Sequence, residues 1–286
     1  MGPPKIDMKL LRVGKPNQEK PAIIDSDGTI RDLSSIIDDL NPDSLNINTI
    51  EIISKTDIKK FPKIAEKERV GACVANPQKF IGIGLNYSDH AEETGMKAPV
   101  EPIIFMKAVS SISGPYDDII IPKNSKKTDW EVELGIIIGK KAQYITQNES
   151  FDHIFGYCLV NDVSEREFQI ERSGQWDKGK GCDTFGPIGP YIVTKDEIED
   201  VQNLNLELKL NGKIMQQGNT NKMIFSVKHI VSYLSHFMTL DSGDIITTGT
   251  PPGVGMARKP QVFLKPGDEM ILKIDNLGIQ KQKVSS

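Results

Sequence analysis

The segment that most constrains the fold of this chain reads Asp129-Trp130-Glu131-Val132-Glu133-Leu134-Gly135-Ile136-Ile137-Ile138. In a β-strand, side chains at positions i and i+2 share one face and lie about 6.6 Å apart. Glu131 and Glu133 are therefore expected to point one way, while Val132 and Leu134 enter the core. The two carboxylates could face a ligand, or they could face solvent on an edge strand, and this segment alone leaves both alternatives open.

A second apolar run ends at Asp162, where a strand is expected to stop. Ser164 and Glu167 fit the S-x-x-E pattern of a capping box, which predicts that a helix begins there. On such a helix, Arg166 and Gln169 would share a face and could project a cation and an amide toward a ligand held at Asp162. Alternatively, Asp162 is a turn residue and Arg166 a surface charge.

A third segment, from Phe80 to Glu93, passes from an apolar strand through a glycine turn into a polar stretch. If that stretch is helical, His90 and Glu93 are neighbours at positions i and i+3. A carboxylate beside an imidazole orients the ring and favours its protonated form, which is how a general base is built. The Gly82-x-Gly84 pair lacks the third glycine of a dinucleotide-binding turn, so no nucleotide cofactor is expected there.

Two glycine-rich loops, over residues 177–187 and 247–255, could bring backbone close to a ligand. Neither loop ends in the GK[ST] sequence of a phosphate-binding loop, so ATP and GTP are not implied. Lys180 would suit a developing enolate oxygen, and Thr250 could donate to a substrate carboxylate. Taken singly, each is more often a solvated loop residue.

Composition excludes several classes of function. A formal net charge of -4 gives no basic excess for nucleic acid or for an anionic membrane surface. The apolar runs fall far short of the roughly 20 residues needed to cross a bilayer. Cys73, Cys158 and Cys182 form no CxxC pair, so neither a disulfide framework nor a thiolate zinc site is indicated. The first residues lack the apolar stretch of a secretory signal, and we expect a cytoplasmic protein.

The composition and the hydrophobic pattern of the sequence change near Pro77. Residues 1–72 carry short extended segments and a polar, Asn-rich stretch, and they are expected to form a small N-terminal accessory domain, with residues 1–7 as an extension. Residues 73–286 alternate apolar strands with Gly and Pro turns, which predicts a strand-rich α+β domain. Within it, a hairpin is expected at Asn211-Gly212, and one amphipathic helix is expected over residues 224–238.

Taken together, these segments resemble the fumarylacetoacetate hydrolase family, whose bacterial members share a catalytic domain folded as a mixed β-roll. The resemblance extends from about Pro77 to the C-terminus and rests on several motifs that occur in the family's order. They are Gly82-x-Gly84-x-Asn86-Tyr87-x-x-His90, Phe105-Met106-Lys107, Asp129-Trp130-Glu131-x-Glu133-Leu134, Asn161-Asp162-x-x-x-Arg166, Lys180 and Thr248-Gly249-Thr250-Pro251-x-Gly253.

The resemblance implies that Glu131, Glu133 and Asp162 hold Mg²⁺ or Mn²⁺. This assignment agrees with their chemistry, because hard divalent cations take oxygen ligands, whereas zinc normally takes His or Cys. Where some relatives place a fourth carboxylate, this chain has Asn86. We therefore expect a site of three carboxylates with additional water.

The resemblance also implies the roles of the remaining side chains. His90, assisted by Glu93, would be the acid and base, and Lys180 would stabilise an enolate. The residues expected to line the substrate pocket are Arg166, Gln169, Thr250 and Lys107.

The implied activity is that of a metal-dependent hydrolase. It would cleave a carbon–carbon bond in a small, acylpyruvate-like 2,4-dioxo acid and release pyruvate, and the family pattern suggests a homodimer. The same site could instead act as an oxaloacetate-type decarboxylase, a 2-oxo-heptadienedioate isomerase or hydratase, or a ureidoglycolate lyase. A rival from another class is a catalytically silent protein that binds metal and ligand.

Overall fold

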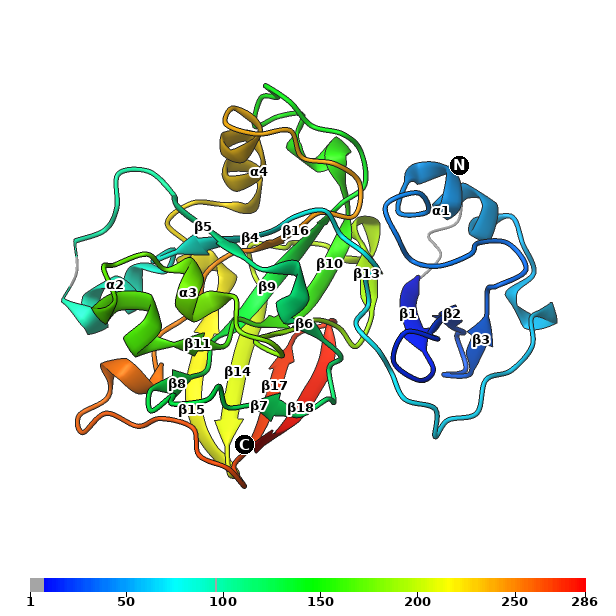
Figure 1. Ribbon diagram of the computed structural model, residues 1–286. Helices are drawn as coiled ribbons and strands as arrows, with labels where there is room; N and C mark the ends of the chain where they lie inside the picture. Colours follow the sequence, from blue (N-terminus) through cyan, green and yellow to red (C-terminus); the bar gives the residue numbers. More distant parts are fainter. Residues whose placement is uncertain (1–7, 96) are drawn as a thin grey trace.

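A computed structural model describes residues 8–95 and 97–286 of the chain (Figure 1). The expected N-terminal extension, residues 1–7, lies outside the described residues. Strands dominate the structure, with short helices at its periphery, so the prediction of a strand-rich α+β fold is confirmed. No helix in the described part of the chain has the length and apolar character required to span a membrane.

The largest element is a nine-stranded mixed sheet. Its strands, in spatial order, are β3 (Ile30–Asp32), β2 (Lys20–Ile24), β1 (Lys9–Val13), β13 (Ile192–Thr194), β10 (Ile154–Asn161), β9 (Val132–Ile138), β16 (Ile245–Thr247), β4 (Phe80–Gly84) and β5 (Ile103–Lys107). The strand β9 lies between β10 and β16 and is buried along its whole length. Alternate residues of β9 enter different cores, with Leu134 and Ile136 on one side and Ile137 on the other.

A second, five-stranded sheet packs against the first through the main apolar core. Its strands, in spatial order, are β15 (Lys213–Asn219), β14 (Asn205–Leu210), β17 (Glu269–Ile274), β18 (Gly278–Ser285) and β7 (Ile119–Ile120). The expected hairpin at Asn211-Gly212 joins β14 to β15, and both turn residues have positive φ (50° and 80°). Asn and Gly tolerate this left-handed backbone, which is why the pair marks a tight hairpin turn.

Two short, two-stranded sheets complete the described fold. They are β8 (Thr128–Asp129) with β11 (Ser164–Glu165), and β6 (Ile112–Ser113) with β12 (Gly186–Pro187). The α-helices are α1 (Ile47–Ser54), α2 (Ser88–Thr94), α3 (Asp177–Lys180) and α4 (Val227–Ser235), and shorter 3-10 turns are η1 (Ile58–Lys60), η2 (Val109–Ser111), η3 (Ser150–His153), η5 (Lys195–Glu197), η6 (Thr220–Lys222) and η7 (Gly255–Ala257). The helix α4 confirms the predicted amphipathic helix, although it begins and ends a turn inside the expected range.

The capping box expected at Ser164 is not formed. Ser164 belongs to β11, and its hydroxyl donates to the carbonyl of Asp162 (3.0 Å). Glu165 takes the capping role instead, because its carboxylate accepts the N–H groups of Phe168 (2.7 Å) and Lys127 (2.8 Å). The predicted helix is a single π-helical turn, η4 (Glu167–Glu171).

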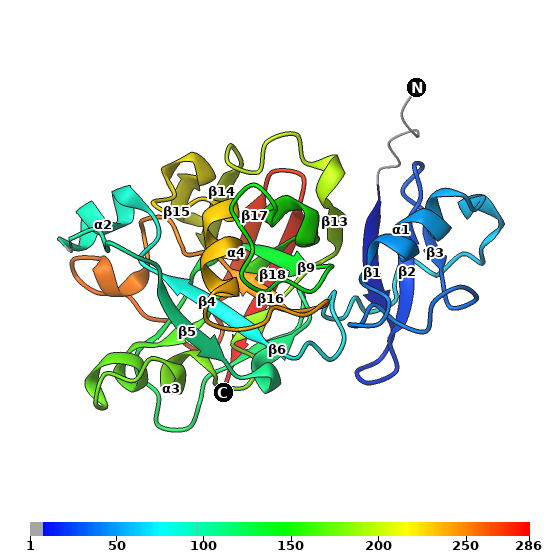
Figure 2. The same ribbon diagram turned by 90° about the horizontal axis from the view of Figure 1, so that it is seen from above.

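The N-terminal residues extend the large sheet. The strand β1 pairs with β13, with Lys9 opposite Val193 and Leu10 opposite Ile192. Figures 1 and 2 show β1, β2, β3 and α1 as a lobe beside the strand-rich roll. The hydrogen-bonded sheet therefore runs from one part into the other, and the division at residue 72 stays a prediction.

Candidate active site

Three carboxylates converge at one end of β9, as the sequence predicted. Glu131 and Glu133 lie on one face of this strand, and Asp162 follows β10 directly. The antiparallel register places Val132 opposite Asn161, and the N–H of Asp162 donates to the carbonyl of Glu131 (2.9 Å). One oxygen from each carboxylate lies within 4.8 Å of the others, and all three side chains are buried.

Two buried ammonium groups hold Asp162. The Nζ atom of Lys180 lies 2.6 Å from Asp162 Oδ2 and 2.7 Å from Glu131 Oε2. The Nζ atom of Lys107 lies 2.6 Å from Asp162 Oδ1 and also donates to the carbonyls of Val163 (3.3 Å) and Lys180 (2.5 Å). Lys180 lines the cavity, whereas Lys107 lies outside it. Lys107 orients Asp162, and its contact with substrate stays a prediction.

The basic partners are distributed unevenly over the three carboxylates. Burial raises the pKa of Glu131, but the Lys180 ammonium and the Arg166 guanidinium outweigh it and lower that pKa to about 2. Burial, together with the neighbouring Asp162 and Glu131, raises the pKa of Glu133 well above its usual range. Among the described residues, Glu133 has no basic side chain within ion-pair distance. Its carboxylate accepts only from Thr247 Oγ1 (2.5 Å) and the N–H of Gly249 (2.8 Å).

Arg166 directly precedes the η4 turn and Gln169 lies within it, and their side chains are in contact, as their spacing predicted. The Nη1 atom of Arg166 donates to Gln169 Oε1 (3.0 Å), and Nη2 lies 2.8 Å from Glu131 Oε1. The Nε atom donates to Asp129 Oδ2 (2.8 Å). Asp129 also accepts the N–H groups of Gly255 (2.7 Å) and Met256 (2.9 Å). Sequence reasoning missed this anchoring role of Asp129.

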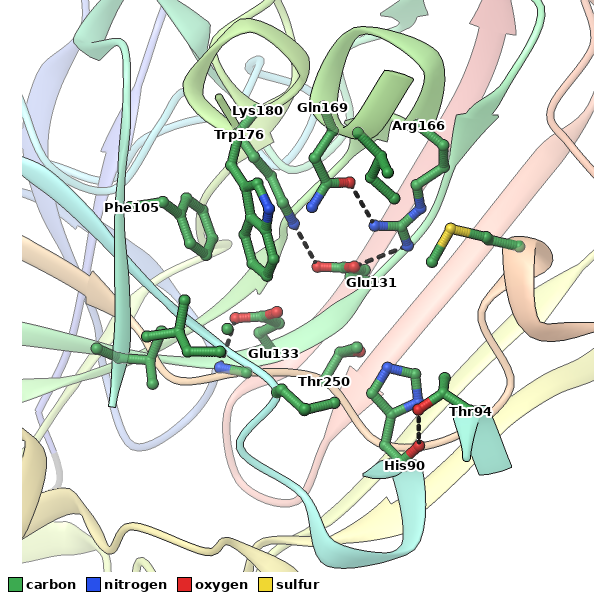
Figure 3. A pocket seen from close by; sticks show the side chains of 17 residues that line it. His90, Thr94, Phe105, Glu131, Glu133, Arg166, Gln169, Trp176, Lys180 and Thr250 are labelled. Atoms are coloured by element: carbon green, nitrogen blue, oxygen red, sulfur yellow. Dashed lines mark hydrogen bonds and ion pairs between the residues drawn. The ribbon is translucent and has the colours of Figure 1, made fainter. Parts of the chain in front are cut away.

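His90 faces the carboxylates from the other side of the cavity (Figure 3). The helix α2 places His90 Nδ1 3.1 Å from Glu93 Oε2, which confirms the expected i, i+3 contact. Both oxygens of Glu93 accept the N–H of Gly253 (3.1 Å each). Glu93 thereby joins the imidazole to the glycine-rich loop over residues 247–255.

The side chains of Thr250 and Asn86 both bond to other groups of the protein. Thr250 borders the cavity, but its hydroxyl donates to the carbonyl of Val132 (3.0 Å) and accepts from Gln216 Nε2 (2.8 Å). Donation to a substrate carboxylate would break the bond to Val132. Asn86 is fully buried and bonds to backbone groups of Phe225 and Thr248, so it is a structural residue.

The Gly82-x-Gly84 pair makes room for two aromatic rings that line the cavity. A Cβ atom at Gly82 would lie 2.1 Å from Phe105 Cζ, and one at Gly84 would lie 2.5 Å from Trp176 Cζ3. The two rings pack at 5.7 Å between centroids, and Figure 3 shows them beside Lys180. These aromatic residues were also missed, because their contacts with glycine join segments distant in sequence.

The cavity bounded by these residues holds about 110 Å³. Its floor carries Glu131, Glu133, Arg166 and Lys180, and the remaining wall is mostly apolar. The site therefore combines an oxygen-rich cation position, an oriented imidazole and a small apolar enclosure.

Comparisons with known proteins identify the family to which this fold and site belong. A sequence profile for the fumarylacetoacetate (FAA) hydrolase C-terminal family matches residues 79–285. The chain belongs to the fumarylacetoacetate hydrolase family.

Individual relatives extend the match to nearly the whole chain. A Burkholderia cenocepacia protein named "putative hydrolase" is 56% identical over 276 residues, which is 96% of this chain and 98% of that protein. The structure of a fumarylacetoacetate hydrolase from Exiguobacterium antarcticum is similar with a TM-score of 0.87 and 33% identity, covering 98% of this chain and 99% of its own. Maleylpyruvate hydrolase from Sphingobium sp. SYK-6, solved with manganese(II) and pyruvate, has a TM-score of 0.82 and 26% identity, covering 97% and 99%.

Proposed function

We propose that the protein is a metal-dependent hydrolase that cleaves a carbon–carbon bond in a small 2,4-dioxo acid and releases pyruvate. The observation that carries this proposal is a cluster of three buried carboxylates, two of which, Glu131 and Glu133, line the same cavity as His90, whose imidazole contacts Glu93. The site of maleylpyruvate hydrolase, with its manganese ion and pyruvate, supports the same head group for this chain.

The donor set fits Mg²⁺ or Mn²⁺. Glu131, Glu133 and Asp162 offer oxygen atoms only, which hard divalent cations prefer. With Asp129 included, four buried carboxylates meet three basic side chains, Lys107, Arg166 and Lys180, and Glu133 is the carboxylate that pairs with none of them. An uncompensated buried charge is costly, so a cation at this position would relieve it. Bound there, the ion would act as a Lewis acid that polarises a 2-oxo acid.

The protein's own side chains account for the remaining steps. His90, oriented by Glu93, takes a proton from a water molecule, which adds to the distal (C4) carbonyl of the substrate. The bond between C3 and C4 then breaks, leaving a carboxylic acid and the enolate of pyruvate. Lys180 stabilises the negative charge on the enolate, and C3 is protonated to give pyruvate. Arg166, directly before the η4 turn, and Gln169, within it, orient the 2-oxo acid head of the substrate.

Pyruvate release from 2,4-dioxopentanoate tests the proposal. We expect turnover with Mg²⁺ or Mn²⁺, loss of turnover with EDTA, and recovery when the metal is restored. Glu133→Gln should lower kcat/KM about 100-fold, because metal ligands and their close partners commonly contribute that much. Glu51→Gln, at an exposed position on α1, is the matched control and should leave kcat/KM unchanged.

Two results would overturn the proposal. One is full turnover after complete removal of metal, because the three carboxylates would then have no catalytic role. The other is loss of CO₂ from oxaloacetate with no pyruvate released from any 2,4-dioxo acid, which would favour the decarboxylase alternative.

A further inference from the structure

Large apolar side chains surround the mouth of the cavity above its charged floor. We call this set the apolar collar, and its members are Leu85, Ile103, Ile170, Trp176 and Met256. None of the five is fully buried, and the side chains of Ile103 and Ile170 are 36% and 46% exposed. Exposed apolar groups gathered at a cavity commonly mark a place where a ligand binds.

The backbone conformation around residues 84 and 85 positions two side chains of the collar. Leu85 has a left-handed φ of 48°, which costs free energy for a residue with a branched side chain. Gly84 lies directly under the Trp176 ring, where any side chain would displace it. The surrounding structure therefore holds both side chains at the mouth of the cavity.

The collar offers no uncommitted positive charge. The described basic residues that line the cavity are His90, Arg166 and Lys180. His90 contacts Glu93, and Lys180 contacts two carboxylates of the cation cluster. Arg166 bridges Asp129 and Glu131. A second carboxylate at the far end of a substrate would therefore lose water without gaining a free cationic partner, which is unfavourable.

We propose that the apolar collar selects substrates by their tail: the enzyme accepts 2-oxo acids whose far end is an uncharged alkyl or aryl group and discriminates against dicarboxylic acids. Trp176 is the principal residue for this selection. The inference rests on the proposed function for the position of the 2-oxo acid head at the carboxylate cluster. It adds the chemical class of the tail, which the cluster itself does not determine.

The test compares equilibrium binding of two acids that differ only at the tail. They are 2-oxohexanoate, which ends in a methyl group, and 2-oxohexanedioate, which ends in a carboxylate. Calorimetry on the full chain loaded with Mn²⁺ should show at least about tenfold tighter binding of 2-oxohexanoate. Across pyruvate, 2-oxobutanoate, 2-oxopentanoate and 2-oxohexanoate, affinity should rise about threefold per methylene.

Variants at collar positions test whether the collar causes this selectivity. Trp176→Ala should lower affinity for 2-oxohexanoate toward that for pyruvate. Ile170→Arg places a cation at the mouth and should tighten binding of 2-oxohexanedioate about tenfold. Ile214→Arg on β15 is the matched control, since Ile214 is 44% exposed and lies outside the cavity lining.

Fluorescence supplies an independent signal. The chain has two tryptophans, and Trp130 is fully buried with its indole N–H bonded to the Gly253 carbonyl. Binding of 2-oxohexanoate should therefore change the emission of Trp176, and Trp176→Phe should abolish that change.

The inference is overturned if 2-oxohexanedioate binds the unmodified protein as tightly as 2-oxohexanoate, or if neither acid binds. If Trp176→Ala does not fold, Ile170→Arg decides the matter, and an unchanged preference in that variant also overturns the inference. Failure to hydrolyse any 2,4-dioxo acid would instead defeat the proposed reaction, because the binding comparison requires no turnover.

Discussion

Asp129 shows how much of this site depends on a residue that contacts neither the proposed cation nor the cavity. Burial lowers the pKa of Arg166, but the nearby Asp129 and Glu131 carboxylates outweigh burial and raise it. Asp129 also accepts two backbone N–H groups from the segment that carries Met256. It therefore fixes both the Arg166 guanidinium and one side of the apolar collar.

Asp129→Asn should raise KM for a 2,4-dioxo acid about tenfold or more, with a smaller change in kcat. The amide removes the charge that holds Arg166, and hydrogen bonds to charged groups contribute about 1.5–3 kcal/mol. Mn²⁺ affinity, measured by calorimetry, should change little because Asp129 is not a proposed ligand. Asp117→Asn breaks another Asp–Arg pair, with Arg69, and is the control. Equal loss of metal affinity and substrate affinity would contradict a positioning role for Asp129.

At the scale of single residues, the sequence predicted the carboxylates well and their partners poorly. Strand periodicity places Glu131 and Glu133 on one face without any knowledge of the rest of the fold. The bonds of Lys107 and Thr250 depend on carbonyl groups from other segments, which no local pattern reveals. The sequence alone could not show that these two side chains bond to the protein itself.

Among the elements, the short helix α2 is tied to the glycine-rich loop over residues 247–255 by one side chain. Glu93 contacts the imidazole on its own helix and the N–H of Gly253 in this loop. Gly253 has a φ of 106°, in the region that favours glycine, and a Cβ there would lie 1.9 Å from the Met215 carbonyl. The helix and the glycine-rich loop consequently position the acid–base pair together.

Glu93→Gln should lower kcat about 10- to 100-fold, because His90 loses the carboxylate that orients it. Affinity for Mn²⁺ and for 2-oxohexanoate should stay within about twofold, since neither the cation cluster nor the collar includes Glu93. Glu92→Gln, at the adjacent exposed position on α2, is the control. Stopped-flow turnover and calorimetry separate the two effects, and equal losses in turnover and binding would contradict the assignment.

The sequence predicted elements with strong periodicity or a turn signature, such as α4 and the Asn211-Gly212 hairpin. It did not predict α1, whose Asn-rich surroundings read as polar loop although Asn46 accepts the N–H of Thr49 and caps the helix. The π-helical turn η4 was read as an ordinary helix. A buried carboxylate, Glu165, stabilises that turn from outside the expected capping pattern, which explains the error.

In the whole molecule, the N-terminal lobe and the large sheet share one apolar core. Leu10 and Leu45 from the lobe belong to the same buried cluster as Phe155 and Ile192. The β1–β13 pairing adds backbone hydrogen bonds across the same junction. The lobe is therefore bound to the roll by packing and by a continuous sheet.

A chain starting at residue 73 should fold poorly on its own. Removing the lobe uncovers the apolar cluster and leaves β13 as an exposed strand edge, which promotes association. We expect the fragment to elute as larger species than the full chain and to bind a hydrophobic dye such as ANS. A fragment that elutes and unfolds as cooperatively as the full chain would instead support an independent domain from residue 73.

All three proposed cation ligands lie on or directly beside the adjacent strands β9 and β10. The two groups that donate hydrogen bonds to Glu133 belong to Thr247 and Gly249, which come much later in the chain. Pairing β9 with β10 closes a short loop, so its entropic cost is small. During translation, the carboxylates therefore leave the ribosome before Thr247 and Gly249 are synthesised. A divalent ion bound by this nascent hairpin would stabilise the strand pairing that created its site.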